Sequence, residues 1–307
     1  MPNELITASS RELATELTAY DEKMLSVFEY LGLPTNNILV KVDERRRVFK
    51  NIEDVLEPLS SETLETSTYI SKFLSAVSAG LFDAALNYLW DETVSQLRFR
   101  VSQYDIQYFF DLAVTSDKRT KLSTEDDLVK IDDSELIQGA KEIGLISDIG
   151  YRLLDNIKFM RNWASAAHPN QVELTGLQLI DWLETCIKEV ISLPLSNLTI
   201  QIGKLLRNIK ANTLDEAEAE TISNFFCELT SEKANSLCNG FFGIYCRIDT
   251  TSDTKRNIKL LLPKLWYLVD EDVKWNCGIK YSKFQINNDQ TEAKLAREFL
   301  QIVNAES

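Results

Sequence analysis

The chain has 307 residues, with 33 Lys and Arg against 47 Asp and Glu, which gives a formal net charge of −14. Hydrophobic residues make up 44% of the sequence and there are only 10 glycines and 6 prolines, which excludes collagen-like, low-complexity and largely disordered chains. The single histidine excludes a metal site built from several histidines of one chain, and the acidity argues against a broad basic surface for duplex nucleic acid.

Hydrophobic residues recur at helical spacing along almost the whole chain, which predicts an all-α protein. Helix-start residues and glycine or proline stops delimit the N-terminal half, where we expect helices at about residues 10–32, 38–58, 60–80, 82–102 and 105–114. The second of these contains Arg45, Arg46 and Arg47. Because Asp43 and Glu44 precede this triplet, we expect a salt-bridged helix surface there rather than an RNA contact.

The second half begins with a polar, charge-rich segment at 115–135, which predicts an exposed connection. Helices are predicted again at about 134–144, 147–167 and 175–192. The segment SLPLSN at 192–197 follows, and the charge balance changes there: 196–307 carry 14 basic and 15 acidic residues, against 19 and 32 in the rest. We therefore expect two domains, 1–195 and 196–307. The second should have four or five helices, with breaks near Thr213, Gly240, 250–252 and Gly278.

The five cysteines have no CxxC spacing and an odd count, so they predict neither a disulfide framework nor a zinc site. Four lie in apolar segments, which is typical of core thiols in a reducing, cytoplasmic compartment. There is no glycine-rich phosphate loop and no nucleophile elbow, and we expect no metal and no other cofactor. The first residues lack a signal-peptide pattern, and the most apolar run, 260–269, is too short to cross a bilayer, so we expect no membrane association.

The segment 141–170 contains the pattern that points to chemistry. Ser147 and Asp148 favour a helix start, and a stripe of apolar residues predicted to be buried follows, formed by Leu153, Leu154, Ile157, Met160, Trp163, Ala164 and Ala167. Arg161 and His168 are seven residues apart, so their directions differ by only about 20° and they project from one helix face. Pro169 ends the helix at His168, where the helix dipole favours a protonated imidazole.

Arg161-Asn162, followed after five residues by His168-Pro169, resembles the signature motif of HEPN (higher eukaryote and prokaryote nucleotide-binding) domains. The segment 80–98 resembles the second long helix of that family, and the resemblance covers roughly residues 60–192. It implies a HEPN-like helical bundle, followed in this chain by a smaller C-terminal helical domain. Many members of the family dimerise with their two motif helices facing each other around a metal-independent ribonuclease site.

The resemblance assigns a role to each of three residues. Arg161 would bind the scissile phosphate, His168 would shuttle the proton to or from the 2′-hydroxyl or the leaving oxygen, and Asn162 would orient the site. A homodimer would supply a second histidine. The expected function is a cytoplasmic endoribonuclease that acts on RNA as a toxin or antiphage-defence effector of the abortive-infection type, and that is restrained by a partner or inhibitor subunit.

Two other functions stay open at this point. A HEPN-like domain can act as a non-catalytic scaffold or regulatory subunit in a defence or toxin–antitoxin system, in which case Arg161 is expected to form an ion pair with an acidic neighbour. A weaker third hypothesis is an accessory role beside a nucleotidyltransferase, with which the same fold is paired.

Other polar and aromatic residues have both a functional and a structural interpretation. Asp91 and Glu92 could support the site or bind a metal, although we expect a solvated helix face. Trp163 could line a base pocket, but it is expected in the core, as is Trp182. The aromatic residues of the C-terminal region are also expected in the core rather than on a stacking surface: Phe225, Phe226, Phe241, Phe242, Tyr245, Trp266, Tyr267 and Trp275.

Overall fold

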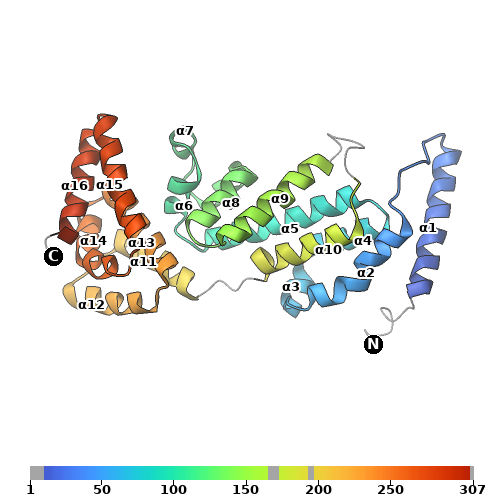
Figure 1. The fold of residues 1–307 in the computed structure, drawn as a ribbon, viewed down its shortest axis with the longest axis horizontal. Coiled ribbons are helices and arrows are strands. Elements are labelled where there is room, and N and C mark those ends of the chain that lie inside the picture. The colour runs from blue at the N-terminus through green and yellow to red at the C-terminus, as the bar shows by residue number, and fades with distance from the viewer. Residues whose placement is uncertain (1–9, 165–172, 193–196, 305–307) are drawn as a thin grey trace. The chain divides into compact units, whose positions relative to one another are not determined.

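The computed structural model describes residues 10–164, 173–192 and 197–304, which form helices and connecting segments without a strand. The prediction of an all-α protein is therefore confirmed for this part of the chain. The chain divides into two compact units (Figure 1). Unit 1 comprises Met1–Phe99 and Ile146–Pro194, and unit 2 comprises Arg100–Leu145 and Leu195–Ser307.

Unit 1 is built around α10, which packs against α2 and α9, while α2 also contacts α1 and α4. Its helices are α1 (Ser10–Tyr30), α2 (Val42–Leu56), α3 (Ser61–Thr66), α4 (Thr68–Ser78), α5 (Phe82–Ser102, whose last turn passes into unit 2), α9 (Asp148–Ala164), α10 (Gly176–Cys186) and a π-helical turn η2 (Ile187–Ile191). Large side chains such as Phe73, Phe82 and Trp90 are buried in its core. Trp182 is also buried, as predicted.

Unit 2 has α13 at its centre, in contact with α11, α14, α15 and α16. Its elements are α6 (Ile106–Ala113), α7 (Ser116–Arg119), η1 (Glu125–Lys130), α8 (Asp133–Glu142), α11 (Asn197–Ala211), α12 (Glu216–Phe225), η3 (Phe226–Glu228), α13 (Ser231–Cys246), α14 (Ser252–Trp266), α15 (Glu271–Ile286) and α16 (Gln290–Asn304). The ring of Phe299 lies 5.1 Å from that of Phe242 and 5.6 Å from that of Tyr245, which places these aromatic residues in the core as expected. Tyr267 and Trp275 are exposed instead.

The units differ from the predicted domains in the placement of residues 100–145, which cluster with the C-terminal helices. Long-range ion pairs join this segment to the C-terminal helices. Lys210 Nζ lies 2.9 Å from Asp105 Oδ2, and Arg247 Nη1 lies 2.6 Å from Asp111 Oδ2. Partners more than 100 residues apart leave no local pattern in the sequence. The charge balance therefore did not indicate that residues 100–145 belong with the C-terminal helices.

Several predicted element boundaries also differ from the structure. The expected exposed connection 115–135 contains α7 and η1, and it buries Leu122, Leu128 and Ile131. The predicted breaks at Gly240 and Gly278 are wrong, because both residues lie inside α13 and α15. A glycine costs a helix interior only about 1 kcal/mol relative to alanine, which tertiary packing readily overrides.

Four of the five thiols are buried and Cys227 is exposed, in agreement with their predicted packing role. Burial raises the pKa of Cys186 to about 12 and that of Cys246 to about 12, so both stay protonated near neutral pH.

The two glycines Gly176 and Gly278 provide a matched test of how closely α10 approaches α2. A Cβ on Gly176 would lie 2.0 Å from the backbone oxygen of Glu44, whereas nothing lies within 4 Å of a Cβ on Gly278. We expect Gly176→Ala to lower the free energy of unfolding by about 1–3 kcal/mol, because the helices must separate. Gly278→Ala should raise it by about 0.5–1 kcal/mol. Urea unfolding followed by circular dichroism measures both, and equal effects would contradict the close α2–α10 contact.

Candidate functional site

The motif helix α9 begins at a conventional cap and ends beside the motif arginine. Ser147 Oγ accepts a hydrogen bond from the backbone N–H of Gly150 at 3.0 Å, which fixes the first turn. Arg161 and Asn162 lie in its last turn. Because Gly150 approaches the carboxylate of Glu189, the start of α9 is held close to the π-helical turn η2. The arginine therefore stands on a helix whose position is set by close packing.

Arg161 projects from the packed face of α9. Leu154 and Ile157 are the buried side chains of this helix, and Arg161 follows them by seven and four residues, so it shares their face. Its side chain is half-buried, and its Nε has no accessible surface and no hydrogen-bond partner among the described residues. Its Nη1 donates to Asn162 Oδ1 at 3.1 Å. Asn162 therefore holds the guanidinium from the side.

Within the described part of the chain, Arg161 makes no ion pair. The expectation of an acidic partner, which belonged to the scaffold interpretation, is thus not met by any described carboxylate. A guanidinium carries five N–H donors in a planar fork that matches phosphate oxygens. One Nη1 donor is used by Asn162 and Nε is inaccessible, so the remaining N–H groups of Nη1 and Nη2 are the ones that can reach an anion.

His168 lies in the segment 165–172, outside the described residues, together with Ala167 and Pro169. The predicted common direction of Arg161 and His168 therefore stays a prediction. The structure brings together only the first two residues of the motif, Arg161 and Asn162.

Three apolar side chains of α9 are exposed. Ile149 is 72% exposed, Leu153 41% and Phe159 53%. The predicted buried stripe is therefore wrong for Leu153, and Met160 and Trp163 are only half-buried. The rings of Phe159 and Trp163 lie 5.7 Å apart. Ile149 and Leu153 are four residues apart and share one helix face, whereas Phe159 points about 120° away from Leu153. Exposed apolar side chains on one helix face are the kind of surface that another protein surface covers.

The sequence predicted a solvated helix face at Glu92. This prediction is wrong, because Glu92 is only 4% exposed. Its Oε1 accepts hydrogen bonds from Ser67 Oγ at 3.2 Å and from Gln96 Nε2 at 3.0 Å. These bonds join the start of α4 to α5 inside unit 1, which is a structural role. Asp91 is half-buried.

The arginine triplet of α2 is split between two environments. Arg46 pairs with Asp43 and Arg47 pairs with Glu44 on the surface, which confirms the predicted salt-bridged helix face for these two residues. Arg45 differs from the prediction, because it has no exposed surface. Its Nη1 and Nη2 donate to Asp21 on α1 at 2.8 and 2.5 Å. This partner lies 24 residues away, so no local spacing indicated it.

No cluster of three or more His, Cys, Asp or Glu suited to a metal ion occurs among the described residues. None of the described helices combines the length and apolar character that crossing a membrane requires. No protein-family model, curated protein or solved structure matches the chain.

Proposed function

We propose that the chain is a metal-independent endoribonuclease of the HEPN type that acts as a toxin or antiphage-defence effector, with a composite site at a homodimer interface. The observation that carries the proposal is Arg161: a half-buried guanidinium, held by Asn162 and free of any described carboxylate, in a chain with a net charge of −14. In so acidic a chain, an arginine that no carboxylate of the described residues pairs with favours an anionic ligand such as a phosphodiester.

The proposed reaction is attack of the RNA 2′-oxygen on the adjacent phosphorus. The bond from phosphorus to the 5′-oxygen breaks, and the products are a 2′,3′-cyclic phosphate and a 5′-hydroxyl. Arg161 would bind the non-bridging oxygens and stabilise the charge that develops on them. His168 would accept the proton of the 2′-hydroxyl or donate one to the leaving oxygen. One protomer supplies a single histidine, so the second would come from the partner.

The exposed pair Ile149 and Leu153 on α9 supports the dimeric part of the proposal. Leu153 precedes Arg161 by eight residues, so their directions differ by about 80° around the helix. A second copy packed on Leu153 and Ile149 would leave Arg161 beside the interface, where a substrate strand can reach it. The negative charge of the chain weakens RNA binding by the free enzyme, which fits an activity that a partner subunit releases.

Cleavage of single-stranded RNA in the presence of EDTA tests the proposal. We expect products with 2′,3′-cyclic phosphate ends and a dimer in analytical ultracentrifugation. Leu153→Glu should give monomers and abolish cleavage, because it places a charge beside Ile149 on the proposed contact face. A stable dimer that binds a protein partner, but never cleaves RNA with or without that partner, would favour the scaffold function instead.

A further inference from the structure

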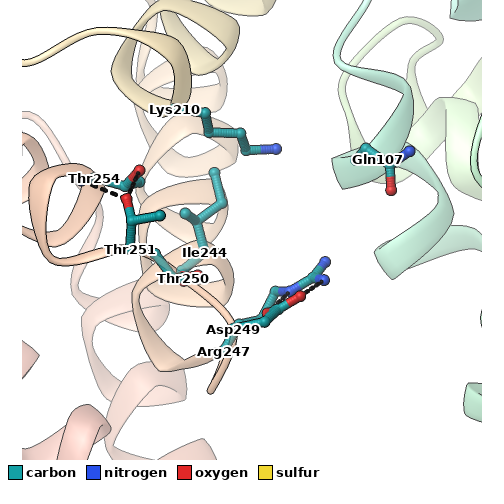
Figure 2. Close-up of a pocket in the computed structure, with 8 residues that line it drawn as sticks. All are labelled: Gln107, Lys210, Ile244, Arg247, Asp249, Thr250, Thr251 and Thr254. Atoms are coloured by element: carbon teal, nitrogen blue, oxygen red, sulfur yellow. Dashed lines mark hydrogen bonds and ion pairs between the residues drawn. The ribbon is translucent and has the colours of Figure 1, made fainter.

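Unit 2 contains a cavity of about 220 Å³ that the ribonuclease site does not use. It is lined by residues of α6, of the end of α11, and of the segment that joins α13 to α14. Figure 2 shows the side chains of Lys210 and Arg247 pointing into the space that faces Gln107. With Asp249, these are the charged lining residues. Each cation is already paired with carboxylates, Lys210 with Asp105 and Arg247 with Asp249 and Asp111. An anion would therefore have to use the hydrogen-bond donors that these pairs leave over, or replace an exposed carboxylate.

Both cations keep hydrogen-bond donors that their carboxylate partners do not use. Arg247 donates from Nε and Nη2 to Asp249 at 2.9 and 2.7 Å, and from Nη1 to Asp111 at 2.6 Å. Three of its five N–H groups are thus occupied and two are left. Among the described residues, Lys210 Nζ donates to Asp105 alone, at 2.9 and 3.0 Å, which leaves at least one of its three N–H groups.

The acidic partners of these two cations are held to different degrees. Asp105 is almost completely buried and also caps α6 through the N–H of Tyr108, so it stays in place. The side chain of Asp249, by contrast, is 70% exposed and lies only two residues from Arg247. Water stabilises such an exposed carboxylate, so a stronger anion can replace it on the guanidinium at small cost.

The rest of the lining adds polar groups that suit an anion. Thr251 caps α14 by accepting the N–H of Thr254 at 3.2 Å, so the cavity lies at the N-terminus of a 15-residue helix. The dipole of such a helix favours negative charge at that end. A second hollow of about 470 Å³ adjoins the cavity, because both are lined by Gln107 and Lys210. Its other charged lining residues are Arg207, Asp105 and Glu125, so the hollow itself carries no excess of positive charge. It gives room for an organic group beyond the anion.

We propose that this cavity is a binding site for a small phosphomonoester, with its phosphate between Lys210 and Arg247 and its organic part in the adjoining hollow. A phosphate monoester carries a charge of about −1.5 to −2 at neutral pH, which exceeds that of one carboxylate. It also presents three oxygens to the donors that remain on the two cations. The cavity accommodates a single phosphate group and not a nucleic-acid duplex, so the ligand is a small molecule. This inference does not depend on the ribonuclease proposal.

Isothermal titration calorimetry of the full chain tests the site with adenosine 5′-monophosphate, inorganic phosphate and adenosine at constant ionic strength. We expect binding of the monophosphate, weaker binding of inorganic phosphate and none of adenosine. Arg247→Gln should weaken binding by about tenfold or more, because it removes a charge-assisted contact. Lys294→Gln removes a positive charge from α16, which does not line the cavity, and should change the affinity less than twofold.

Asp249→Asn provides the decisive variant, since it is expected to tighten phosphate binding severalfold. It removes the carboxylate that competes for Arg247, and a variant that merely fails to fold cannot bind more tightly. The proposal is overturned if the wild type binds neither phosphate probe at millimolar concentration. It is equally overturned if Arg247→Gln and Asp249→Asn leave the affinity unchanged, or if adenosine binds as well as its monophosphate.

Discussion

Replacing Arg161 with glutamine is expected to lower the rate of metal-independent RNA cleavage by about a hundredfold to a thousandfold, which is the usual loss when a donor to a developing oxyanion is removed. Glutamine retains an amide near the position of the guanidinium, but it has no charge and cannot bind two phosphate oxygens in parallel. Because Arg161 makes no ion pair with a described carboxylate, the substitution breaks no salt bridge in the described part of the fold. The measurement is single-turnover cleavage of a labelled RNA in EDTA.

Arg152 offers a matched control on the same helix. It is an exposed arginine of α9, stacked over the ring of Tyr151 at 5.5 Å, and it belongs to neither the motif nor the packed face. Arg152→Gln removes the same charge and should change the cleavage rate less than threefold. His168→Ala should lose activity as Arg161→Gln does, while all three variants keep the dimer and the melting temperature of the wild type. Equal activity of Arg161→Gln and Arg152→Gln would remove Arg161 from the site.

Helical periodicity was sufficient to predict the fold class and the approximate span of many helices, because packing of apolar faces dominates helix formation. It failed where tertiary contacts oppose a local signal. Gly240 lies inside α13, and a Cβ there would lie 3.2 Å from the ring of Tyr108, so close packing rather than a helix break explains this glycine. Residues 115–135 are charged enough to predict an exposed connection, but three buried aliphatic side chains anchor them.

The motif helix shows a different limit of sequence analysis. An apolar spacing indicates that a face is suited to burial, but it does not tell what covers that face. In α9, Leu154 and Ile157 are covered within unit 1, whereas Leu153 is exposed beside Ile149. The sequence predicted Leu153 in the same core stripe as Leu154 and Ile157. Only the structure separates the face that holds the fold together from the face available to a second copy.

Charged residues were the least predictable, because their partners come from distant segments. The cavity cations Lys210 and Arg247 lie 37 residues apart in the sequence, and each pairs with a carboxylate of the segment 100–145. No motif or spacing marked them. Arg45 likewise looked like its two neighbours in α2, and its burial depends on a carboxylate in α1.

The buried Arg45 is therefore expected to hold α1 against the rest of unit 1. Besides Asp21, it donates to the backbone oxygens of Val40 and Ser78 at 2.7 and 3.1 Å. Gly80, with φ of +74°, allows this arrangement, because a Cβ there would lie 2.9 Å from the guanidinium. All sides of the charge are thus occupied by protein groups, and removal of one partner cannot be compensated by water.

Asp21→Ala should lower the free energy of unfolding by about 3–5 kcal/mol, because it leaves a buried positive charge without its counter-ion. Asp43→Ala is the matched control: it removes the partner of the more exposed Arg46 and should cost no more than about 1 kcal/mol. Urea unfolding measures both, and hydrogen exchange should show faster exchange in α1 only for Asp21→Ala. The double substitution Asp21→Leu with Arg45→Met should recover most of the loss, since it removes both charges together. Equal costs for the two alanine variants would contradict the anchoring role, because that role depends on the burial that distinguishes Arg45 from Arg46.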